Sequence, residues 1–469
     1  MASASSLLKA RWVALSAALA VFALFLFAPA VLNDGDTYLH IAAGRWMIEN
    51  WAVLRIDFFS YTFAGHPWIT HEWLSEVLMA LAYVTAGWSS TVLLFAIAGG
   101  LMAWLLSYYL GKHLSGLPLL ATLVLALSSM AGSFLARPHI LALPLMVVWT
   151  AELIRAADEG RQPPYWLLCI MVLWANMHAS FAFGLAFILP MALEDALKRG
   201  LRVAAQDWAL FAVLAVLAAL ATPHGIYGLL FPLDLLSKSQ LYAVGEWSPL
   251  DLHRFQPAIL MMGLALFVFL SRGMRIAPLR LILLLFVSYL ALVQVRHVML
   301  LTIMGSLLLA RLLADLLTNQ PDLPARGGRK MMLGFGLAFV LLAGVRLLIP
   351  LQRGDGITTP ATALAHVPAK LLTAPVLNDY QFGGYLIYRD LRPFIDGRVE
   401  LYSGRFLNRY LDIVSGNPRV LADTLTRYHV RWTILAPANP ASAVMDTMPG
   451  WKRLYSDPYA VVHVKTETL

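Results

Sequence analysis

The sequence is poor in charge and almost free of cysteine. Only 13% of its 469 residues are charged, against roughly 25% in an ordinary soluble domain. Its single cysteine, Cys169, lies inside an apolar run, so the chain can form no intrachain disulfide and no cysteine-based metal site. The sequence also lacks a glycine-rich phosphate-binding loop of the Walker type, internal repeats and low-complexity tracts. These absences argue against a soluble domain, a disulfide-stapled scaffold and an ATP-driven enzyme.

Long apolar runs take the place of charge. Hydrophobic residues make up 59% of the chain, and apolar runs of about 16–22 residues, the length that crosses a bilayer, recur almost to position 350. We therefore predict a mainly α-helical, polytopic transmembrane bundle of about eleven spans in residues 1–350, followed by a small external α/β domain in residues 351–469. The expected spans are 12–32, 89–111, 117–134, 139–155, 165–178, 180–197, 208–222, 257–271, 280–295, 298–317 and 331–350.

Lys and Arg concentrate at one end of the expected spans. The net charge of +8 therefore does not indicate a nucleic-acid partner, because the basic residues follow the positive-inside rule for cytoplasmic loops. This rule places the N-terminus in the cytoplasm, with residues 12–32 as an uncleaved first helix. The loops 33–88 and 223–256 and the segment after residue 351 then share the opposite face. We expect a multi-pass protein of the bacterial inner membrane whose C-terminal domain is periplasmic.

An acidic motif, Asn33-Asp34-Gly35-Asp36, stands where the first apolar run meets water. Carboxylates this close to hydrocarbon are costly to hold and usually face a water-filled cavity that has a function. Apolar residues at helical spacing predict a surface helix over 37–50, on which Asp36 and His40 share one face. A structural explanation also exists, since Asp36 could serve only as the N-cap of this helix.

Further elements are expected on the external face. A second surface helix is predicted over 70–86, with Thr70 as its cap. Glu72 in its first turn also suits the helix dipole, which is a purely structural explanation. Short apolar runs between turn-forming residues predict the elements of the C-terminal domain. The expected strands are 375–378, 393–395, 432–435 and 459–464, and the expected helices are 404–415 and 418–428.

Unusual polar residues gather at the span ends on the external face. An arginine fork binds phosphate oxygens by two hydrogen bonds, and histidine adds a further donor. A carboxylate can deprotonate an acceptor hydroxyl or hold a divalent cation such as Mg²⁺ or Mn²⁺. The candidates are Asp34 and Asp36 as catalytic residues; Arg137, His139, Arg296 and His297 as ligands of a donor phosphate; His40, His71, Glu72, His178, His224 and Glu246 around the cavity or acceptor; and Asp34, Asp36 and Glu72 as metal ligands.

These features resemble the GT-C class of integral-membrane glycosyltransferases. The resemblance covers most of the chain and rests on Asp34-Gly35-Asp36 after the first helix, on the two surface helices and on the external C-terminal domain. In more detail, the segments 34–40, 71–74 and 394–398 resemble a bacterial group of such proteins. The resemblance implies a polyprenyl-linked sugar donor, and Asp34 or Asp36 as general base or metal ligand.

Two segments depart from the pattern of the oligosaccharyltransferases in this class. Those enzymes carry a second acidic pair in the next external loop, where this chain has Arg137 and His139. The segment 378–385 is similar to the element with which they read acceptor peptides, but its tryptophans are missing. The resemblance therefore does not imply a metal site of their type or recognition of a peptide acceptor.

Three functions are compatible with these observations. The first is transfer of a sugar from a polyprenyl-phosphate-type donor to a glycan, lipid or protein acceptor on the periplasmic face. The second is a glycan ligase of the O-antigen ligase or polymerase type, which would depend on Arg and His and tolerate loss of both aspartates. The third is a transporter or flippase for a lipid-linked glycan. Transporters, however, usually place polar groups near the bilayer midplane and often show repeats.

Overall fold

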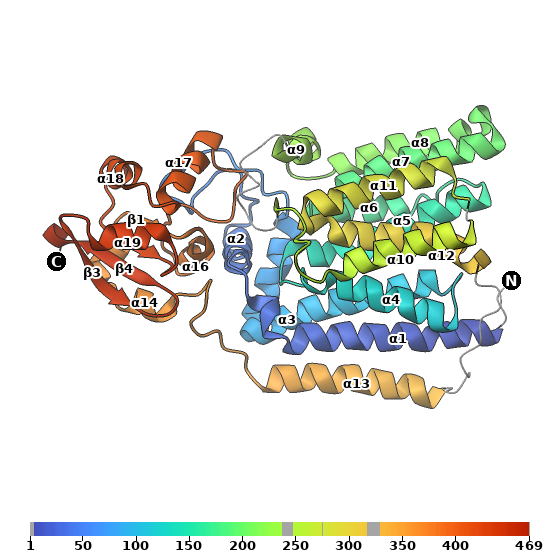
Figure 1. The fold of residues 1–469 in the computed structure, drawn as a ribbon, viewed down its shortest axis with the longest axis horizontal. Coiled ribbons are helices and arrows are strands. Elements are labelled where there is room, and N and C mark those ends of the chain that lie inside the picture. Colours follow the sequence, from blue (N-terminus) through green and yellow to red (C-terminus); the bar gives the residue numbers. More distant parts are fainter. Residues whose placement is uncertain (1–3, 237–246, 274, 317–328, 469) are drawn as a thin grey trace.

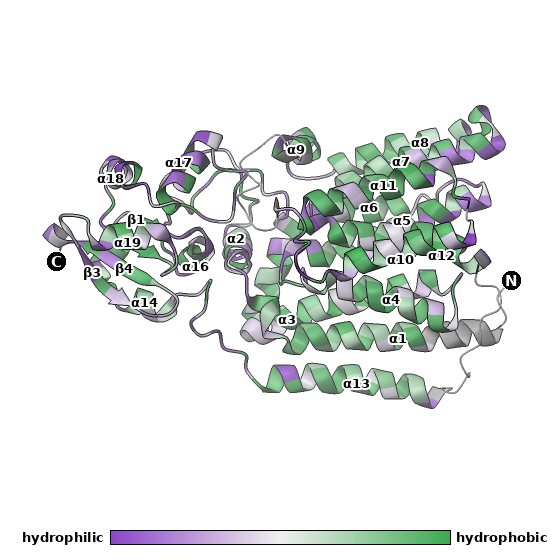
Figure 2. Cartoon of the chain, in the orientation of Figure 1, coloured by the Kyte–Doolittle hydropathy of each residue, from purple (hydrophilic) through white to green (hydrophobic). Residues whose placement is uncertain are grey.

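The computed structural model describes residues 4–236, 247–273, 275–316 and 329–468. Long helices lie side by side in a bundle, and a smaller domain with a four-stranded sheet stands at one end of it (Figure 1). Helix α2 (Asp36–Asn50) lies between these two parts. Hydrophobic residues dominate the bundle helices, whereas the smaller domain carries a mixture (Figure 2). The chain is thus a helical membrane-type fold with a small α/β unit attached.

Each apolar run that was expected to span the membrane forms a helix. The bundle contains α1 (Ala4–Phe27), α3 (Trp73–Leu110), α4 (Gly116–Ala131), α5 (Pro138–Glu159), α6 (Leu167–Met177), α7 (Phe181–Arg199), α8 (Leu201–Leu220), α9 (Ile226–Leu236), α10 (Pro257–Arg272), α11 (Pro278–Val293), α12 (Val298–Leu316) and α13 (Arg329–Leu348). Within the described residues, five helices are long and apolar enough to cross a membrane, and several others are shorter and apolar. The count of about eleven crossings therefore stays a prediction.

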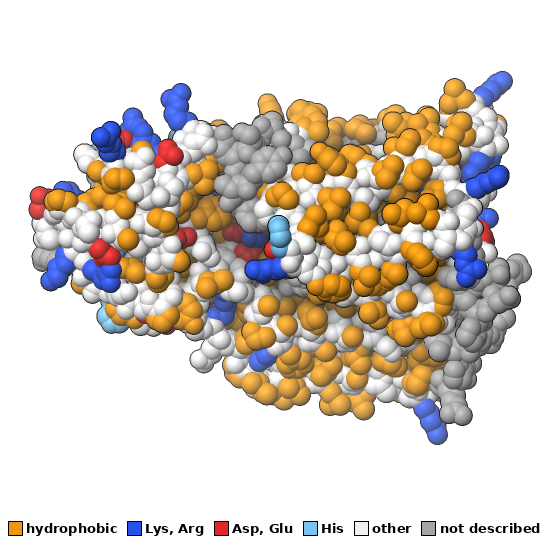
Figure 3. Space-filling view, viewed as in Figure 1, with side chains coloured by type: hydrophobic (Ala, Val, Ile, Leu, Met, Phe, Trp, Pro, Cys, Tyr) orange, Lys and Arg blue, Asp and Glu red, His pale blue; other side chains and the backbone are white. Residues whose placement is uncertain are grey.

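Ion pairs join the bundle helices at the end far from the sheet. The buried guanidinium of Arg280 on α11 binds Glu194 of α7 at 2.8 Å and also contacts Asp158 of α5. Lys and Arg side chains are visible along this end of the molecule (Figure 3). This is the end for which the sequence predicts the cytoplasmic loops.

Residues 33–88, which the sequence predicts to be the first external segment, confirm one predicted helix and correct two details. Helix α2 covers the expected range, but its N-cap is Gly35, and the Asp34 carboxylate accepts the N–H of Asp36 at 2.8 Å. The second surface helix continues into the next span as one long helix, α3, which is interrupted at Ala86 and Gly87. Thr70 is not its cap, because the Thr70 hydroxyl donates to the carbonyl of Leu54 instead.

The C-terminal domain is a four-stranded sheet covered by short helices. Its strands are β1 (Val376–Asn378), β2 (Trp432–Leu435), β3 (Trp451–Ser456) and β4 (Val461–Lys465), in the order β1-β2-β4-β3. The β1–β2 pair is parallel, and the other two pairs are antiparallel. Its helices are α14 (Ala361–Ala365), α15 (Ala369–Leu372), α16 (Gly383–Tyr388), α17 (Gly404–Val414), α18 (Pro418–Arg427) and α19 (Pro440–Asp446), and a short 3-10 turn covers Tyr380–Phe382. Helices α17 and α18 match their predicted ranges closely.

Two strand predictions differ from the structure. The segment 393–395 is buried and extended but is not a strand, because its backbone binds a side chain rather than a neighbouring strand. The Phe394 N–H donates to Asn378 Oδ1 at 2.7 Å, and the Ile395 carbonyl accepts from Asn378 Nδ2 at 2.8 Å. Strand β3 was not predicted, because it is an edge strand whose residues are all partly or fully exposed, so it lacks a buried apolar run.

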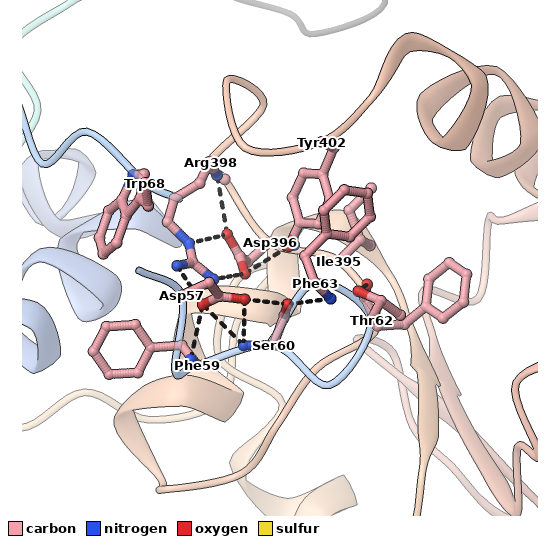
Figure 4. A network of polar contacts seen from close by, with 12 residues as sticks. Asp57, Phe59, Ser60, Thr62, Phe63, Trp68, Ile395, Asp396, Arg398 and Tyr402 are labelled. Atoms are coloured by element: carbon pink, nitrogen blue, oxygen red, sulfur yellow. Dashed lines mark hydrogen bonds and ion pairs between the residues drawn. The ribbon is translucent and has the colours of Figure 1, made fainter. Parts of the chain in front are cut away.

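A buried arginine fastens the first external segment to the C-terminal domain (Figure 4). Arg398 is 2% exposed, and its guanidinium binds Asp57 Oδ1 at 2.7 Å and Asp396 Oδ2 at 2.7 Å. It also lies over the ring of Trp68, and Tyr402 donates to Asp396 at 2.8 Å. Burial acts to raise the pKa of Asp396, but the charge of Arg398 outweighs this effect and lowers it. The two carboxylates and the cation therefore form a charged, fully paired cluster.

Replacement of Arg398 by methionine should separate the two parts. The variant would leave Asp57 and Asp396 buried without a cation, which costs about 3–5 kcal/mol. We expect residues 57–63 and 394–402 of the full-length chain to lose protection from amide hydrogen exchange by a corresponding amount. The matched control is Arg409→Met, which breaks a pair of Arg409 with the well-exposed Asp423 and should leave this protection unchanged. Equal effects of the two substitutions would contradict the assigned role of Arg398.

Candidate functional site

The acidic motif lies in close contact with the C-terminal domain. The carbonyl of Gly35 approaches Gly384 on α16 so closely that a Cβ at Gly384 would lie 2.1 Å from it. A Cβ at Gly397 would lie 1.8 Å from the Asp36 carboxylate. Only glycine fits at both positions, so the sequence of the C-terminal domain is adapted to the motif. The backbone and the carboxylate of the motif are therefore held in place from both sides.

Arg137 joins the two aspartates of the motif. It precedes α5, and its Nε contacts Asp34 Oδ2 while its Nη2 lies 3.1 Å from Asp34 Oδ1 and 2.6 Å from Asp36 Oδ2. The Asp34 side chain is 5% exposed, and those of Asp36 and Arg137 are each 19% exposed. A guanidinium that is shared by two carboxylates offsets one of their two negative charges in a weakly solvated place.

A cavity of about 520 Å³ opens at these three residues. Asp34, Asp36 and Arg137 line one side of it, and the C-terminal domain forms the other side. A recess with acidic and basic side chains is visible between the two parts of the molecule (Figure 3). Of the predicted phosphate ligands, only Arg137 lines this cavity in the described part of the chain. The volume is in the range of small-molecule sites.

A second polar cluster surrounds Glu72, the residue that precedes α3. It includes His40, which lies one turn after Asp36 on α2. Glu72 Oε1 lies 3.4 Å from His178 Nε2 and 3.5 Å from His71 Nε2, and its Oε2 lies 3.8 Å from His40 Nε2. The other ring nitrogen of His40 is hydrogen-bonded to Glu76 at 3.0 Å. The structure therefore brings four of the predicted cavity residues together, and it adds Glu76, which was not predicted.

The carboxylates and histidines of this cluster shift the pKa values of one another. Burial acts to lower the pKa of His40, but its hydrogen bond to Glu76 and the nearby carboxylates raise it to about 9. Burial acts to raise the pKa of Glu72, but the charge of His71 outweighs this and lowers it well below its usual range. His40 is therefore a cation at neutral pH.

The other predicted residues make mostly different contacts, although the His139 ring lies edge-on to the His178 ring of the Glu72 cluster at 6.1 Å. His139 Nε2 is within 3.2 Å of the Ser133 carbonyl, the Arg296 guanidinium lies 4.2 Å from the Trp247 ring, and the buried His297 ring packs edge-on against Phe183. His224 is half-buried in a turn before α9, and burial lowers its pKa. Glu246 lies outside the described residues. The proposed common phosphate site of Arg137, His139, Arg296 and His297 is thus not tested by these contacts.

Solved structures show which fold this arrangement belongs to. No family model matches the sequence, and no curated protein matches it. The oligosaccharyltransferase AglB from Archaeoglobus fulgidus, in complex with an inhibitory peptide and a dolichol-phosphate, is similar over 98% of this chain and 74% of its own, with 12% identity and a TM-score of 0.51. The same enzyme tethered to an acceptor peptide with an NVT sequon is similar over 90% of this chain and 68% of its own, with 12% identity and a TM-score of 0.54.

The chain has the fold of the GT-C class. At this low identity the likeness concerns the fold, and the chemistry has to be argued from the residues of this chain. In this chain, residues 33–88 and the C-terminal domain lie at the same end of the bundle (Figure 1).

A divalent cation does not fit the residues that were expected to bind it. The three expected ligands were Asp34, Asp36 and Glu72, but Glu72 belongs to the histidine cluster, and both aspartates bind the guanidinium of Arg137. The described residues contain no group of three or more His, Cys, Asp or Glu side chains that could hold a metal ion. Arg137 supplies the positive charge between the two carboxylates, so this geometry does not support the expected metal site.

Sequence reasoning missed the far wall of the cavity. This wall includes Asp379, Tyr380, Tyr410 and Asn439 of the C-terminal domain. Asp379 is buried and accepts a hydrogen bond from Asn439 Nδ2 at 3.0 Å. The only sequence signal for this wall is the similarity of the segment 378–385 to an acceptor-reading element, which by itself assigns no role to these residues. The contact of this segment with the acidic motif depends on the tertiary structure and has no local pattern.

The His40 environment makes stability depend on pH. Because the pKa of His40 is raised from 6.5 to about 9 on folding, protonated His40 stabilises the fold fully below pH 6.5 and loses this contribution as the pH rises through 9. The loss amounts to at most about 3 kcal/mol. We expect a His40→Gln variant to be less stable than the parent chain at pH 6.5 and to approach it at pH 9.5. Chemical denaturation of the full chain in detergent measures this difference.

The control for this experiment is His253→Gln, because the His253 side chain is fully exposed. This variant should follow the pH dependence of the parent chain. A difference between the parent chain and His40→Gln that does not change between pH 6.5 and 9.5 would show that His40 does not carry the expected charge.

Proposed function

We propose that this chain is a membrane glycosyltransferase that transfers a sugar from a polyprenyl-phosphate-type lipid donor. The GT-C fold and the position of the acidic motif support this proposal. The observation that carries it is the cavity between the bundle and the C-terminal domain, in which Asp34, Asp36 and Arg137 converge. We further propose that this face is periplasmic and that the membrane is a bacterial inner membrane, as the distribution of basic residues predicts.

Asp36 is the better general base of the two aspartates. Both oxygens of Asp34 are occupied, since Oδ1 accepts the Asp36 N–H and both oxygens contact Arg137. Its side chain is also more buried than that of Asp36, which is 19% exposed at the cavity. Asp34 and Arg137 then act as positioning residues that fix the Asp36 carboxylate, while Gly397 supports it from the opposite side.

The reaction follows from these positions. Asp36 takes the proton from an acceptor hydroxyl, the acceptor oxygen forms a bond with the anomeric carbon of the donor sugar, and the bond between that carbon and the phosphate oxygen breaks. The phosphate leaves on its lipid with the electron pair and with the negative charge. A cation near the cavity has to stabilise this charge. Arg137 is engaged by both carboxylates, so a further arginine is needed for this step.

The nature of the acceptor is a separate part of the proposal. The AglB structures contain peptides, but the predicted acceptors of this chain are glycans, lipids and proteins without preference among them. The far wall of the cavity carries the hydroxyl and amide groups of Tyr380, Gln381 and Asn439, although the Tyr380 hydroxyl also donates to the Gly397 carbonyl and Asn439 Nδ2 to Asp379. Such groups suit the hydroxyl pattern of a sugar or glycan acceptor, which we infer to be the acceptor class.

Substitution of Asp36 by asparagine tests the base. We expect Asp36→Asn to reduce sugar transfer from a polyprenyl-phosphate donor by about 10²- to 10⁴-fold, with a folded chain. Asp34→Asn should cause a smaller loss, because it weakens only the position of Asp36. The matched control is Asp390→Asn, which removes an 84% exposed carboxylate paired with Arg45 and should keep full activity. Radiolabelled sugar transfer in membranes measures these rates.

The outcome also separates the proposed enzyme from its alternatives. Full activity of both aspartate variants would exclude the base mechanism and favour the O-antigen-ligase type, which depends on Arg and His. Movement of a lipid-linked glycan across vesicles without a covalent product would favour a flippase.

Transfer should not require a divalent cation. Because Arg137 provides the positive charge between Asp34 and Asp36, we expect transfer to continue in EDTA and the purified full chain to bind no Mn²⁺ at micromolar concentration. Arg137→Gln should lose activity, since two neighbouring carboxylates would then repel each other. Loss of transfer in EDTA with recovery on addition of Mn²⁺ would contradict this assignment.

A further inference from the structure

Within the described residues, two arginines at the outer end of α13 have no carboxylate at ion-pair distance. Arg346 lies in the last turn of α13, a helix whose apolar stretch is almost entirely exposed on the surface of the bundle. Arg346 itself, in contrast, is buried, with an exposed fraction of only 8%. Its Nη2 donates to the Ile349 carbonyl at 2.5 Å, and its Nη1 lies 3.5 Å from the Leu26 carbonyl of α1. A cation that turns inward on a helix facing lipid is costly, so it marks a site with a function.

Arg353 follows five residues after the end of α13. Its guanidinium carbon lies 4.1 Å from the ring of Tyr38 and 4.9 Å from that of Trp88. Its Nη2 donates to the hydroxyl of Thr358 at 3.2 Å. The aromatic rings hold the cation by its faces and leave its edges for hydrogen bonds. Leu351 fixes the segment, because its N–H donates to Ser89 on α3 at 3.0 Å.

Neither guanidinium is neutralised within the described part of the chain. No carboxylate lies within ion-pair distance of either arginine there, whereas Arg137, Arg280 and Arg398 are all paired. Arg346 Nε and Arg353 Nη1 are buried and have no hydrogen-bond partner. A buried donor that is left without a partner costs about 1–3 kcal/mol, more when it is charged. Two such donors, on arginines that lie seven positions apart within and after the last turn of α13, point to an anion with several acceptor oxygens.

The surroundings indicate which anion this is. The exposed apolar side chains of α13 include Leu341, Val345 and Leu348, which suit the chain of a lipid. Thr358, the partner of Arg353, lines the cavity that contains the acidic motif. A phosphate is the group that an arginine edge binds best by two-point hydrogen bonding. A lipid phosphate at this place would have its tail along α13 and its head beside the cavity.

We propose that Arg346 and Arg353 bind the phosphate headgroup of a membrane lipid at the outer end of α13. The shared chemistry fits two sources, a polyprenyl phosphate and an anionic phospholipid. Only the identification with the polyprenyl donor rests on the proposed function. In that case Arg353 is the additional cation that stabilises the departing phosphate, which Arg137 is not placed to do.

Lipid binding to the full chain tests this site directly. The chain in neutral detergent is titrated with a polyprenyl phosphate, with phosphatidylglycerol and with phosphatidylcholine, and bound lipid is counted by native mass spectrometry. The Arg346→Gln/Arg353→Gln double variant should bind polyprenyl phosphate at least about tenfold more weakly than the parent chain, because charged two-point hydrogen bonds are lost. Arg353→Lys should keep part of the binding. The matched control is Arg392→Gln at an exposed arginine of the C-terminal domain, which should bind normally.

Each outcome decides the proposal. Weaker binding of polyprenyl phosphate alone supports a donor site, and equally weaker binding of phosphatidylglycerol supports a general site for anionic lipids; both support a phosphate headgroup. Unchanged binding of both anionic lipids by the double variant would overturn it. A fall in thermal stability without lipid, combined with unchanged binding, would show that the arginines are only structural. The experiment measures lipid binding and not sugar transfer. The binding result therefore stays valid even if the chain proves not to be a glycosyltransferase.

Discussion

The buried cluster of Asp57, Arg398 and Asp396 is the constraint on which the candidate site depends. It connects residues 341 positions apart and fastens the first external segment to the C-terminal domain. The same turn of the C-terminal domain contains Gly397, which contacts the Asp36 carboxylate. Loss of the cluster would therefore release one wall of the cavity as well as the contact between the parts. Fully paired burial makes a cation such as Arg398 tolerable, but only while both of its partners stay in place.

Charge balance organises the two polar clusters along α2 in opposite ways. At the start of the helix, the single guanidinium of Arg137 binds the carboxylates of both Asp34 and Asp36 and offsets one of their two negative charges. One turn later, His40 meets Glu72 and Glu76, and further histidines surround Glu72. Because Asp36 and His40 are on the same helix, a movement of α2 would change both clusters together. The helix therefore links the protonation of the histidine cluster to the position of Asp36, the proposed base.

Features that depend on local patterns were predictable from the sequence. Apolar length located the bundle helices except α9, which lies in the predicted loop 223–256; helical spacing located α2, and short apolar runs located β1, β2 and β4. The pairing of Arg137 with Asp34 was not predictable, since it joins residues 103 positions apart, and the sequence suggested a phosphate for Arg137 instead. The buried, apolar segment 393–395 has the sequence pattern of a strand. That pattern does not reveal that its backbone is hydrogen-bonded by the Asn378 side chain and not by a neighbouring strand. Long-range polar contacts were thus the part that the sequence left undetermined.

The arginines of this chain differ in whether the protein itself supplies their counter-charge. Arg280 and Arg398 are buried between carboxylates, and such pairs hold helices and domains together without a ligand. Arg346 and Arg353 have carbonyl, hydroxyl and aromatic partners but no described carboxylate. A protein that only needed to anchor α13 would gain more from apolar side chains, because unpaired cations near hydrocarbon are costly. Their presence beside the cavity that contains the acidic motif is therefore the basis for proposing an anion that arrives with the lipid.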